Sequence, residues 1–357
     1  MTAKEAKKLL RGNTAKPKEP LFLSTGSTLV NLACTGHTRR GFMAGKYYLL
    51  VGGTNSGKTW LAHNALAEAS ITPAFDNYDF YYNNPEGGAL FDIEKFFGKK
   101  LAQRIKEPPG GTSYYVEEFY YSVDDANKLA KKNKRPFIYV LDSMDAVNSL
   151  SQSKIFTKQK NAHRKNRKVP ASYTDGKAAR NSTDMRLLLT PMEQMGSILI
   201  VIGQRRASFD PFDPDNRAGG TALSFYATIE IWMDKIKQIK REVKSVNEQL
   251  GNISRVRIKR SRVAGKDRIV HIPIYHSIGI DDTGSLIDWL VKREHWKGSK
   301  DIDGSVKAPE FGFEGGKDEL AQLVEEMDAE KQLRSIVSGV WREIEEECEI
   351  KRKRRYA

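Results

Sequence analysis

The sequence has only two cysteines, Cys34 and Cys348, and neither has the close spacing of a metal-binding or disulfide motif. It also has no apolar run near the roughly 18 residues that a membrane-spanning helix needs. The first twenty residues, "MTAKEAKKLLRGNTAKPKEP", are basic and lack the apolar centre of a signal peptide. These absences predict a cytoplasmic protein with ordinary thiols and no contact with a membrane.

Acidic residues are scarce outside one segment. The net charge is +14, yet residues 301–350 hold 15 Asp and Glu against 5 Lys and Arg. Residues 1–300 therefore carry about +19, which indicates a polyanionic partner, with nucleic acid as the leading candidate and a solubilising surface as the alternative. Residues 153–172, "SKIFTKQKNAHRKNRKVPAS", hold seven Lys and Arg and no acid. Charge alone leaves three interpretations open: a solvated surface, a localisation signal or a nucleic-acid patch.

Short apolar runs alternate with helical patterns from residue 21 to about residue 296. "KYYLLVGG", "PFIYVLDS", "SILIVIGQ" and "ATIEIWMD" are typical of strands that are covered on both faces. "WLAHNALAEA" and "MRLLLTPMEQMG" between them predict helices. The alternation predicts an α/β fold with a mostly parallel central sheet flanked by helices. "VRIKRSRVAGKDRIVHIPIYHSIG" predicts two further strands around a turn, as an antiparallel extension.

The pattern divides the chain into three parts. Residues 1–20 form a basic N-terminal arm, residues 21–296 form the core, and residues 297–357 form an acidic helical region with a basic tail. Within the last part, "DGSVKAPEFGFEGG" has the composition of a linker and is followed by one or two acidic helices. Because this region is acidic beside a basic body, it is also a candidate to fold back over the basic surface.

A phosphate-binding loop follows the first long strand. "GGTNSGKT" contains Gly52-x-x-x-x-Gly57-Lys58-Thr59 between an apolar strand and a helix. Glycines let successive backbone N–H groups surround phosphates, and the helix N-terminus adds partial positive charge. We expect Lys58 to reach the β- and γ-phosphates and the Thr59 hydroxyl to ligate Mg²⁺. The predicted nucleotide-binding residues are Gly52, Gly53, Thr54, Asn55, Ser56, Gly57, Lys58, Thr59 and Trp60.

Carboxylates at the ends of neighbouring strands complete this site. Asp142 ends the run "FIYVLD" and is the second predicted Mg²⁺ ligand; Asp145 is the weaker candidate, because it is expected in the following helical turn. Glu86 follows the strand-like "YDFYYNN" and is a candidate to orient the attacking water, with a solvent-facing loop carboxylate as the alternative.

The order of these motifs resembles the RecA family of recombinases, including its phage UvsX-type members. "STGS" before the approach to the phosphate-binding loop, "VIGQRRA" and "RAGGTALSFYATIEIWMD" are similar to family segments. Glu86 stands twelve residues before Gly98, which is the family's spacing between a catalytic Glu and a helix-closing Gly. The resemblance covers most of residues 21–296 and implies a RecA-like core. Ile93 departs from it, because the family has an adenine-stacking Tyr at that position.

The resemblance implies a DNA-dependent ATPase that binds ATP and Mg²⁺ and forms a homo-oligomeric filament on single-stranded DNA. It further implies pairing with double-stranded DNA, strand exchange, and roles in recombination and repair, in a bacterial host cytoplasm if the chain is phage-encoded. Glu86 would be catalytic, and Gln204 would sense the γ-phosphate. "KRSRVAGK" places the cations that reach a neighbouring subunit's γ-phosphate at Arg260 and Arg262, although Lys259 allows a slip of one residue.

Two segments correspond to the family's DNA-binding loops. The first is the basic run after the Asp142 strand, and the second lies between Gln204 and Gly219. Arginines there are available for phosphates, and two phenylalanines are available to wedge between bases or stack on them. The implied DNA-binding residues are Lys158, Lys160, Arg164, Lys165, Arg167, Lys168, Arg205, Arg206, Phe209, Phe212, Arg217, Gly219 and Gly220.

Two other functions remain open at this stage. A ring helicase of the DnaB type would be a closed translocating motor, although the segment from Gly219 to Asp234 and the lack of an N-terminal helical domain argue against it. A non-catalytic RecA-like paralogue would coat DNA without turnover, although the set of Lys58, Glu86 and Gln204 argues against that. Fold alone does not choose among these functions.

Overall fold

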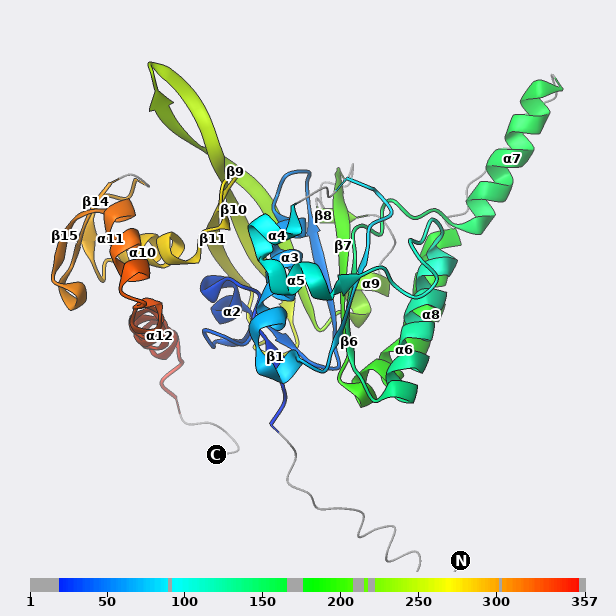
Figure 1. Cartoon of the computed structure of the whole chain (residues 1–357), viewed down its shortest axis with the longest axis horizontal. Coiled ribbons are helices and arrows are strands. Elements are labelled where there is room, and N and C mark those ends of the chain that lie inside the picture. Colours follow the sequence, from blue (N-terminus) through cyan, green and yellow to red (C-terminus); the bar gives the residue numbers. More distant parts are fainter. Residues whose placement is uncertain are drawn as a thin grey trace, which may run out of the picture.

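The computed structural model describes residues 19–88, 92–165, 176–207, 215–217, 222–301 and 304–352. A large central sheet crosses the molecule in the strand order β12-β11-β10-β9-β3-β7-β6-β4-β5, and β8 pairs with β7 (Figure 1). Strands β9, β3, β7, β6, β4 and β5 run parallel, while β10, β11 and β12 are antiparallel to their neighbours. The strands are β3 (Tyr47–Gly52), β4 (Asp79–Asn83), β5 (Ile105–Lys106), β6 (Phe137–Leu141), β7 (Ile198–Ala207), β8 (Asp215–Arg217), β9 (Ile229–Val243), β10 (Val246–Ser261), β11 (Arg268–Tyr275) and β12 (Gly279–Ile280).

Successive residues of the parallel strands face two different cores, as the period of two in a strand requires. Tyr48 and Leu50 of β3 face one core, which is completed by α2, α3 and α10. Leu49 and Val51 face the other core, which α6, α8 and α9 cover. Continuous apolar strands are therefore explained by helices on both faces, and the predicted α/β fold with a mostly parallel sheet is confirmed.

Helices connect the strands and cover both faces of the sheet (Figure 1). Within the described ranges, no helix is both long and apolar enough to cross a membrane. The helices are α2 (Thr28–Thr35), α3 (Lys58–Ile71), α4 (Ile93–Phe97), α5 (Lys99–Arg104), α6 (Val116–Asn133), α7 (Leu150–Arg164), α8 (Gly176–Met195), α9 (Ala222–Tyr226), α10 (Asp282–Lys292), α11 (Lys317–Glu326) and α12 (Glu330–Glu347). A two-stranded sheet of β1 (Phe22–Leu23) and β2 (Phe42–Met43) precedes β3.

The antiparallel extension exists, but it is longer than the sequence patterns predict. β9 continues past Asp234 to Val243, turns at Lys244 and Ser245, which both have positive φ, and returns as β10. The outer part of this hairpin projects from the body (Figure 1). Its side chains are mostly polar and exposed, so it lacks the apolar run that marks the buried strands.

The basic run of residues 153–172 is helical over its first part rather than a loop. The helix α7 begins after Ser149, whose hydroxyl accepts from the backbone N–H of Gln152, and ends at Arg164. It has no buried residue and projects away from the sheet (Figure 1). The expectation of a continuous loop is therefore wrong up to residue 164, and residues 166–175 lie outside the described ranges.

The C-terminal region contains a small sheet as well as the expected helices. The stretch that reads as a linker forms β14 (Ser305–Ala308) and β15 (Phe313–Gly316), which pair with β13 (Lys297–Gly298). The linker prediction is therefore wrong, because buried Val306 and Ala308 give these strands an apolar face. The helices α11 and α12 follow as expected.

The acidic helix α12 lies far from the basic helix α7. Trp341 of α12 stacks on Trp289 of α10, and Glu345 forms ion pairs with Lys266 and with Arg268. Figure 1 shows α12 and α7 at opposite ends of the molecule. The acidic region thus packs on the antiparallel end of the sheet, so α12 does not cover the part of the predicted basic surface that α7 forms.

Candidate nucleotide site and nucleic-acid interface

The phosphate-binding loop (residues 52–59) joins the end of β3 to the start of α3. Gly52 fits only without a side chain, because a Cβ there would lie 2.1 Å from the carbonyl oxygen of Met233. Gly57 has φ of 91°, and a Cβ would lie 2.2 Å from Cδ1 of Ile274. Ser254 of β10 also holds the loop, since its hydroxyl donates to the Ser56 carbonyl at 2.9 Å. The loop is therefore fixed from the adjoining strands β9, β10 and β11.

Lys58 is buried at the centre of this loop. Its ammonium group donates to the carbonyl oxygens of Gly52 at 3.0 Å and of Gly53 at 2.6 Å. Burial lowers the pKa of Lys58, and the nearby carboxylates, above all Asp142, oppose that change. The side chain is thus held inside the loop, where it can exchange carbonyl partners for phosphate oxygens.

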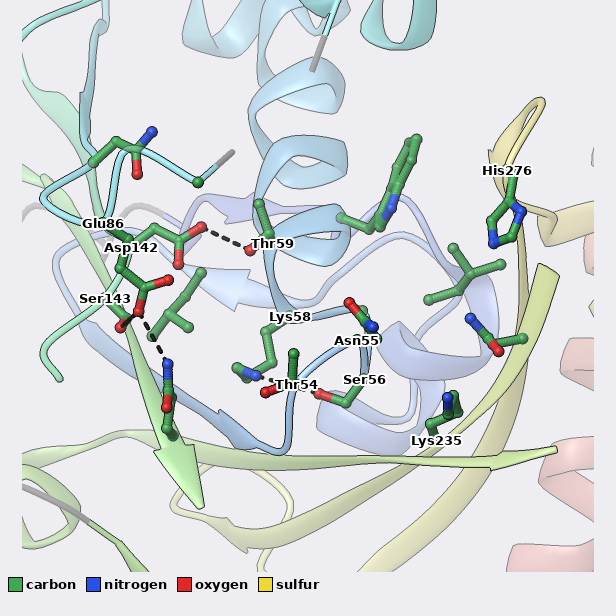
Figure 2. Close-up of a pocket in the computed structure, with 18 of the residues that line it drawn as sticks. Thr54, Asn55, Ser56, Lys58, Thr59, Glu86, Asp142, Ser143, Lys235 and His276 are labelled. Carbon is green, nitrogen blue, oxygen red and sulfur yellow. Dashed lines mark hydrogen bonds between the residues drawn. The ribbon is translucent and has the colours of Figure 1, made fainter. Parts of the chain in front are cut away.

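Thr59 and Asp142 meet next to Lys58. The Thr59 hydroxyl donates to Oδ2 of Asp142 at 2.7 Å (Figure 2). A hydroxyl and a carboxylate are hard oxygen donors, which suit Mg²⁺ when phosphates and waters supply the remaining ligands. The described residues contain no cluster of three or more His, Cys, Asp or Glu that could hold a metal without such a partner. The pair therefore fits a nucleotide-bound Mg²⁺.

Glu86, Gln204 and Ser143 form a hydrogen-bonded group beside this pair. The side-chain amide of Gln204 donates to Oε1 of Glu86 at 3.0 Å, and the Ser143 hydroxyl donates to the same oxygen at 2.5 Å (Figure 2). Three parallel neighbours, β4, β6 and β7, deliver these residues, because their carboxyl ends lie at one edge of the sheet. The structure thus brings Glu86 and Gln204 to the phosphate-binding loop although they are 118 residues apart.

Asp145 takes a different position from Asp142. It lies in a turn before α7 and not in a helix, so that part of the expectation is wrong. Its Oδ2 accepts from the backbone N–H of Gln204 at 2.6 Å. Asp145 therefore anchors the end of β7, while Asp142 contacts Thr59.

Residues 54–60 line one cavity of about 680 Å³ together with Glu86, Asp142, Ser143 and Gln204. One end holds Glu86, Asp142 and Ser143, and the other end reaches Lys235 and His276 (Figure 2). Sequence reasoning missed the second end, because it depends on how the β9–β10 hairpin and the turn after β11 approach the loop. The further lining residues from this side are Gln249, Asn252 and Ile274.

Trp60 is the last residue of the predicted nucleotide-binding set. Its ring lies 5.2 Å from the rings of both Phe96 and Phe97, and a Cβ on Gly279 would lie 2.6 Å from it. Trp60 also lines the cavity, whereas Ile93 of α4 packs against the core. The cavity thus has an aromatic side chain from α3, Trp60, and position 93 supplies none.

Arg260 and Arg262 lie away from this cavity. Arg260 Nη1 donates to the carbonyl of Ser224 at 3.0 Å, and Arg262 donates to the carbonyl of Phe225. Arg260 pairs with Glu230 of β9, whereas Gly52 pairs with Met233, three residues further along the same strand. Neither arginine lines its own nucleotide cavity. Lys259, the slipped alternative, lies 4.4 Å over the ring of Trp232.

The described DNA-binding candidates fall on three elements, α7, β7 and β8. Exposed cations on or directly after α7 are Lys158, Lys160, Arg164 and Lys165. Arg205 of β7 pairs with Asp234 at 3.1 Å, so it is already bound within the chain. For Arg206 and Arg217 the structure describes only the backbone pairing between β7 and β8. Outside the described ranges lie Arg167, Lys168, Phe209, Phe212, Gly219 and Gly220.

Comparisons with known proteins agree with this arrangement. The RecA N-terminal domain model matches residues 167–281, which include β7 and the β9–β10 hairpin. The RecA protein of Chlorobaculum parvum is 25% identical over 304 residues, which cover 84% of this chain and 75% of that protein. The RecA protein of Rubrobacter xylanophilus is 26% identical over 276 residues, or 74% of this chain and 69% of that protein. Over most of its length the chain is therefore similar to RecA proteins.

The matches differ in how much of each relative they cover. The RecA protein of Tropheryma whipplei is 27% identical over 143 residues, which are 40% of this chain and only 30% of that protein. This similarity agrees with the order of the motifs and with the parallel sheet that carries them.

Proposed function

We propose that this chain is an ATP-dependent DNA recombinase of the phage UvsX type. In this proposal it polymerises on single-stranded DNA and promotes pairing and strand exchange with a homologous duplex. The hydrogen bond between Gln204 and Glu86 beside the phosphate-binding loop is the observation that supports it most directly. It joins a candidate water-positioning carboxylate to a strand that continues into the candidate DNA segment.

ATP hydrolysis is the chemical part of the proposal. Lys58 and the backbone N–H groups of the loop would bind the phosphates, and Thr59 with Asp142 would hold Mg²⁺, which neutralises charge on the phosphoryl oxygens. Glu86 would orient and activate the attacking water, because its Oε1 is fixed by two donors while its carboxylate faces the cavity.

The second end of the cavity would hold the nucleoside. Gln249 Nε2 donates to Oδ1 of Asn252 at 3.1 Å, so these two amides form a unit. One amide oxygen and one amide NH₂ group on this pair can still meet a base edge, and adenine offers a matching donor and acceptor. This pair can therefore contact a nucleobase even though position 93 is Ile93.

DNA binding would use the basic elements that project from the cavity's edge of the sheet. The helix α7 carries exposed cations without a buried face, which suits contact with a phosphate backbone. Its position after β6, whose end carries Asp142, connects it to the nucleotide site. Binding of DNA and of ATP can then influence each other through a few residues.

Polymerisation would bring Arg260 and Arg262 to a neighbouring subunit's nucleotide. A head-to-tail contact that does not close produces a helical filament. Because both arginines lie away from their own cavity, they can act on bound nucleotide only from another protomer.

Electron microscopy with single-stranded DNA and a slowly hydrolysed ATP analogue tests the proposal. Helical filaments that dissolve when ATP is hydrolysed are the expected result. Closed rings would favour a DnaB-type helicase, and DNA-coated particles without ATP turnover would favour a non-catalytic paralogue. A parallel strand-exchange assay with homologous and heterologous duplexes separates pairing from simple annealing.

A further inference from the structure

Tyr82 lies in β4, before Glu86, and contacts the candidate Mg²⁺ site, although no motif gives it a role. Its hydroxyl donates to Oδ2 of Asp142 at 2.9 Å. The Thr59 hydroxyl donates to the same oxygen at 2.7 Å. One carboxylate oxygen of Asp142 is therefore held by two hydroxyl donors, which come from β4 and from the first turn of α3.

The tyrosine is itself fixed from both sides. It pairs with Val140 of β6, two residues before Asp142, and its ring lies 4.5 Å from the ring of His63. His63 Nδ1 lies 2.9 Å from the Thr59 carbonyl oxygen, so the same helix turn that carries Thr59 also orients Tyr82. The geometry links strand β4, helix α3 and the end of β6 through one hydroxyl group.

The hydroxyl can act only as a donor to this carboxylate. A phenol hydroxyl is neutral near pH 7 because its ordinary pKa is about 10. A hydrogen bond from a neutral donor to an ionised carboxylate is stronger than a bond between neutral groups.

We propose that Tyr82 is a positioning residue for the Mg²⁺ ligand Asp142. The Tyr82 hydroxyl fixes Oδ2 of this carboxylate and so directs Oδ1 toward the metal's coordination shell. The inference rests on the proposed nucleotide function and adds a residue to it. Groups that orient a metal ligand from behind commonly change metal affinity by about 10- to 100-fold when they are removed. The role depends on a single hydroxyl group, so phenylalanine is the matching substitution.

The experiment compares Tyr82→Phe with Tyr81→Phe in the full chain. Tyr81 is the neighbouring residue of β4 and faces the opposite core, beneath α6, so its change removes the same atom without contact to Asp142. ADP binding is measured by calorimetry in EDTA, and the ADP complex is then titrated with Mg²⁺. Mn²⁺ serves as a second, spectroscopic probe of the same site.

Tyr82→Phe is expected to leave ADP affinity in EDTA unchanged, because Lys58 and the loop still bind the phosphates. The affinity of the ADP complex for Mg²⁺ should fall about tenfold, and Tyr81→Phe should leave it unchanged. In an Asp142→Asn background, Tyr82→Phe should cause no further loss, because the carboxylate that it orients is gone.

Three results would overturn the inference. One is an unchanged Mg²⁺ titration in a folded Tyr82→Phe variant. Another is a parallel loss of ADP affinity in EDTA or of thermal stability, which would make Tyr82 a packing residue. If the unaltered chain binds no ADP even with Mg²⁺, the proposed function fails, and the inference fails with it. Because the first two results leave ADP binding by the unaltered chain intact, they are distinguishable from the third.

Discussion

Gln204 Nε2 donates to Oε1 of Glu86 at 3.0 Å, and this bond joins the end of β7 to the segment after β4. The next residues of β7 lead into the candidate DNA segment, beginning with Arg205. A change in that segment can therefore move Gln204 and alter how Glu86 is held. Under the proposed function, such a path would give a physical basis for ATP hydrolysis that depends on DNA, because water positioning would require the correct placement of both side chains.

Glu86→Gln should abolish most ATP turnover and retain ATP binding. The amide keeps the size of the side chain and can still accept from Ser143, but it cannot take a proton from the attacking water. Loss of a positioned base typically lowers the rate about 10²- to 10⁴-fold. Turnover is measured with excess single-stranded DNA, and binding is measured with a fluorescent nucleotide; Lys58→Ala serves as the variant that loses turnover altogether.

Asp79→Asn and Asp92→Asn are the matched controls for Glu86. The structure gives each a separate local role: Asp79 pairs with Lys106 at 2.9 Å, and Asp92 accepts from the backbone N–H of Lys95 at the start of α4. We expect turnover near the unaltered rate in both. If Glu86→Gln turns over normally while either control is inactive, the assignment of Glu86 is wrong.

Arg260 and Arg262 should affect assembly and turnover together. Changing both to Ala removes the cations proposed to reach a neighbour's nucleotide, so filament formation and DNA-stimulated ATPase should both fall, while isolated protomers still bind nucleotide. Light scattering, microscopy and calorimetry measure the three properties. Because each arginine also donates to a carbonyl of α9, the double change to Lys is the control that retains charge. Unimpaired assembly and turnover in the Ala variant would contradict the role in trans.

The central part of the site could be predicted because local sequence specifies it. The glycine spacing of residues 52–57 and the apolar runs before Asp142 and Gln204 each reflect a requirement that a short segment meets by itself. Tyr82 and the Gln249–Asn252 pair gave no such signal. Their positions depend on register across the sheet, and a one-residue shift would turn each side chain to the other face.

The fold divides in the same way. Strands buried on both faces are continuous apolar runs, so β3, β6 and β7 were predictable. The outer β9–β10 hairpin carries polar, exposed residues, and pairing rather than burial explains it, whereas β14 has a short apolar face that alternates with exposed residues. The helix α7 buries nothing, so it lacks the apolar stripe by which helices are predicted from sequence.

Asp281→Asn should stabilise the fold above neutral pH. Burial, with nearby acids, raises the pKa of Asp281 to about 6 in the folded chain, from 3.8. The folded state therefore favours the protonated carboxyl, and the free energy of unfolding falls as pH rises from about 4 to 6 and stays low above that. Asn has no charge and can still accept from Gly284 at the start of α10, so it removes a penalty of about 3 kcal/mol.

Thermal unfolding from pH 3.5 to pH 8 measures this effect. Asp281→Asn should match the unaltered chain at the acidic end and exceed it progressively up to about pH 6. Asp124→Asn changes an exposed carboxylate on α6 and should shift stability little at any pH, as exposed ion pairs do. A gain that is equal at all pH values would show that charge at Asp281 is not the cause.

Cations of α7 should set how steeply DNA affinity depends on salt. Changing Lys158, Lys160, Arg164 and Lys165 to Ala removes four exposed charges from a helix without a buried face, and Ala favours helix. Each lost phosphate contact on single-stranded DNA should flatten the log–log dependence of affinity on salt by about 0.7. Fluorescence anisotropy with labelled single strands at several salt concentrations gives this slope.

The control for α7 removes equal charge from a distant surface. The four lysines of the control are all exposed, and they are Lys99, Lys100, Lys131 and Lys132. The last two lie in the final turn of α6. The opposite end of α6 is the one near α7, because Tyr115 there contacts Ser153. Changing these four to Ala should leave the slope almost unaltered, because the charges lie too far from the DNA to displace its counterions.

Phe209→Ala and Phe212→Ala should instead lower affinity at every salt concentration, since stacking is worth about 1–3 kcal/mol per base and releases no counterions. An α7 variant that binds normally with an unchanged slope would mean that this helix is solvated surface, and DNA contact would then rest on the segment after Gln204.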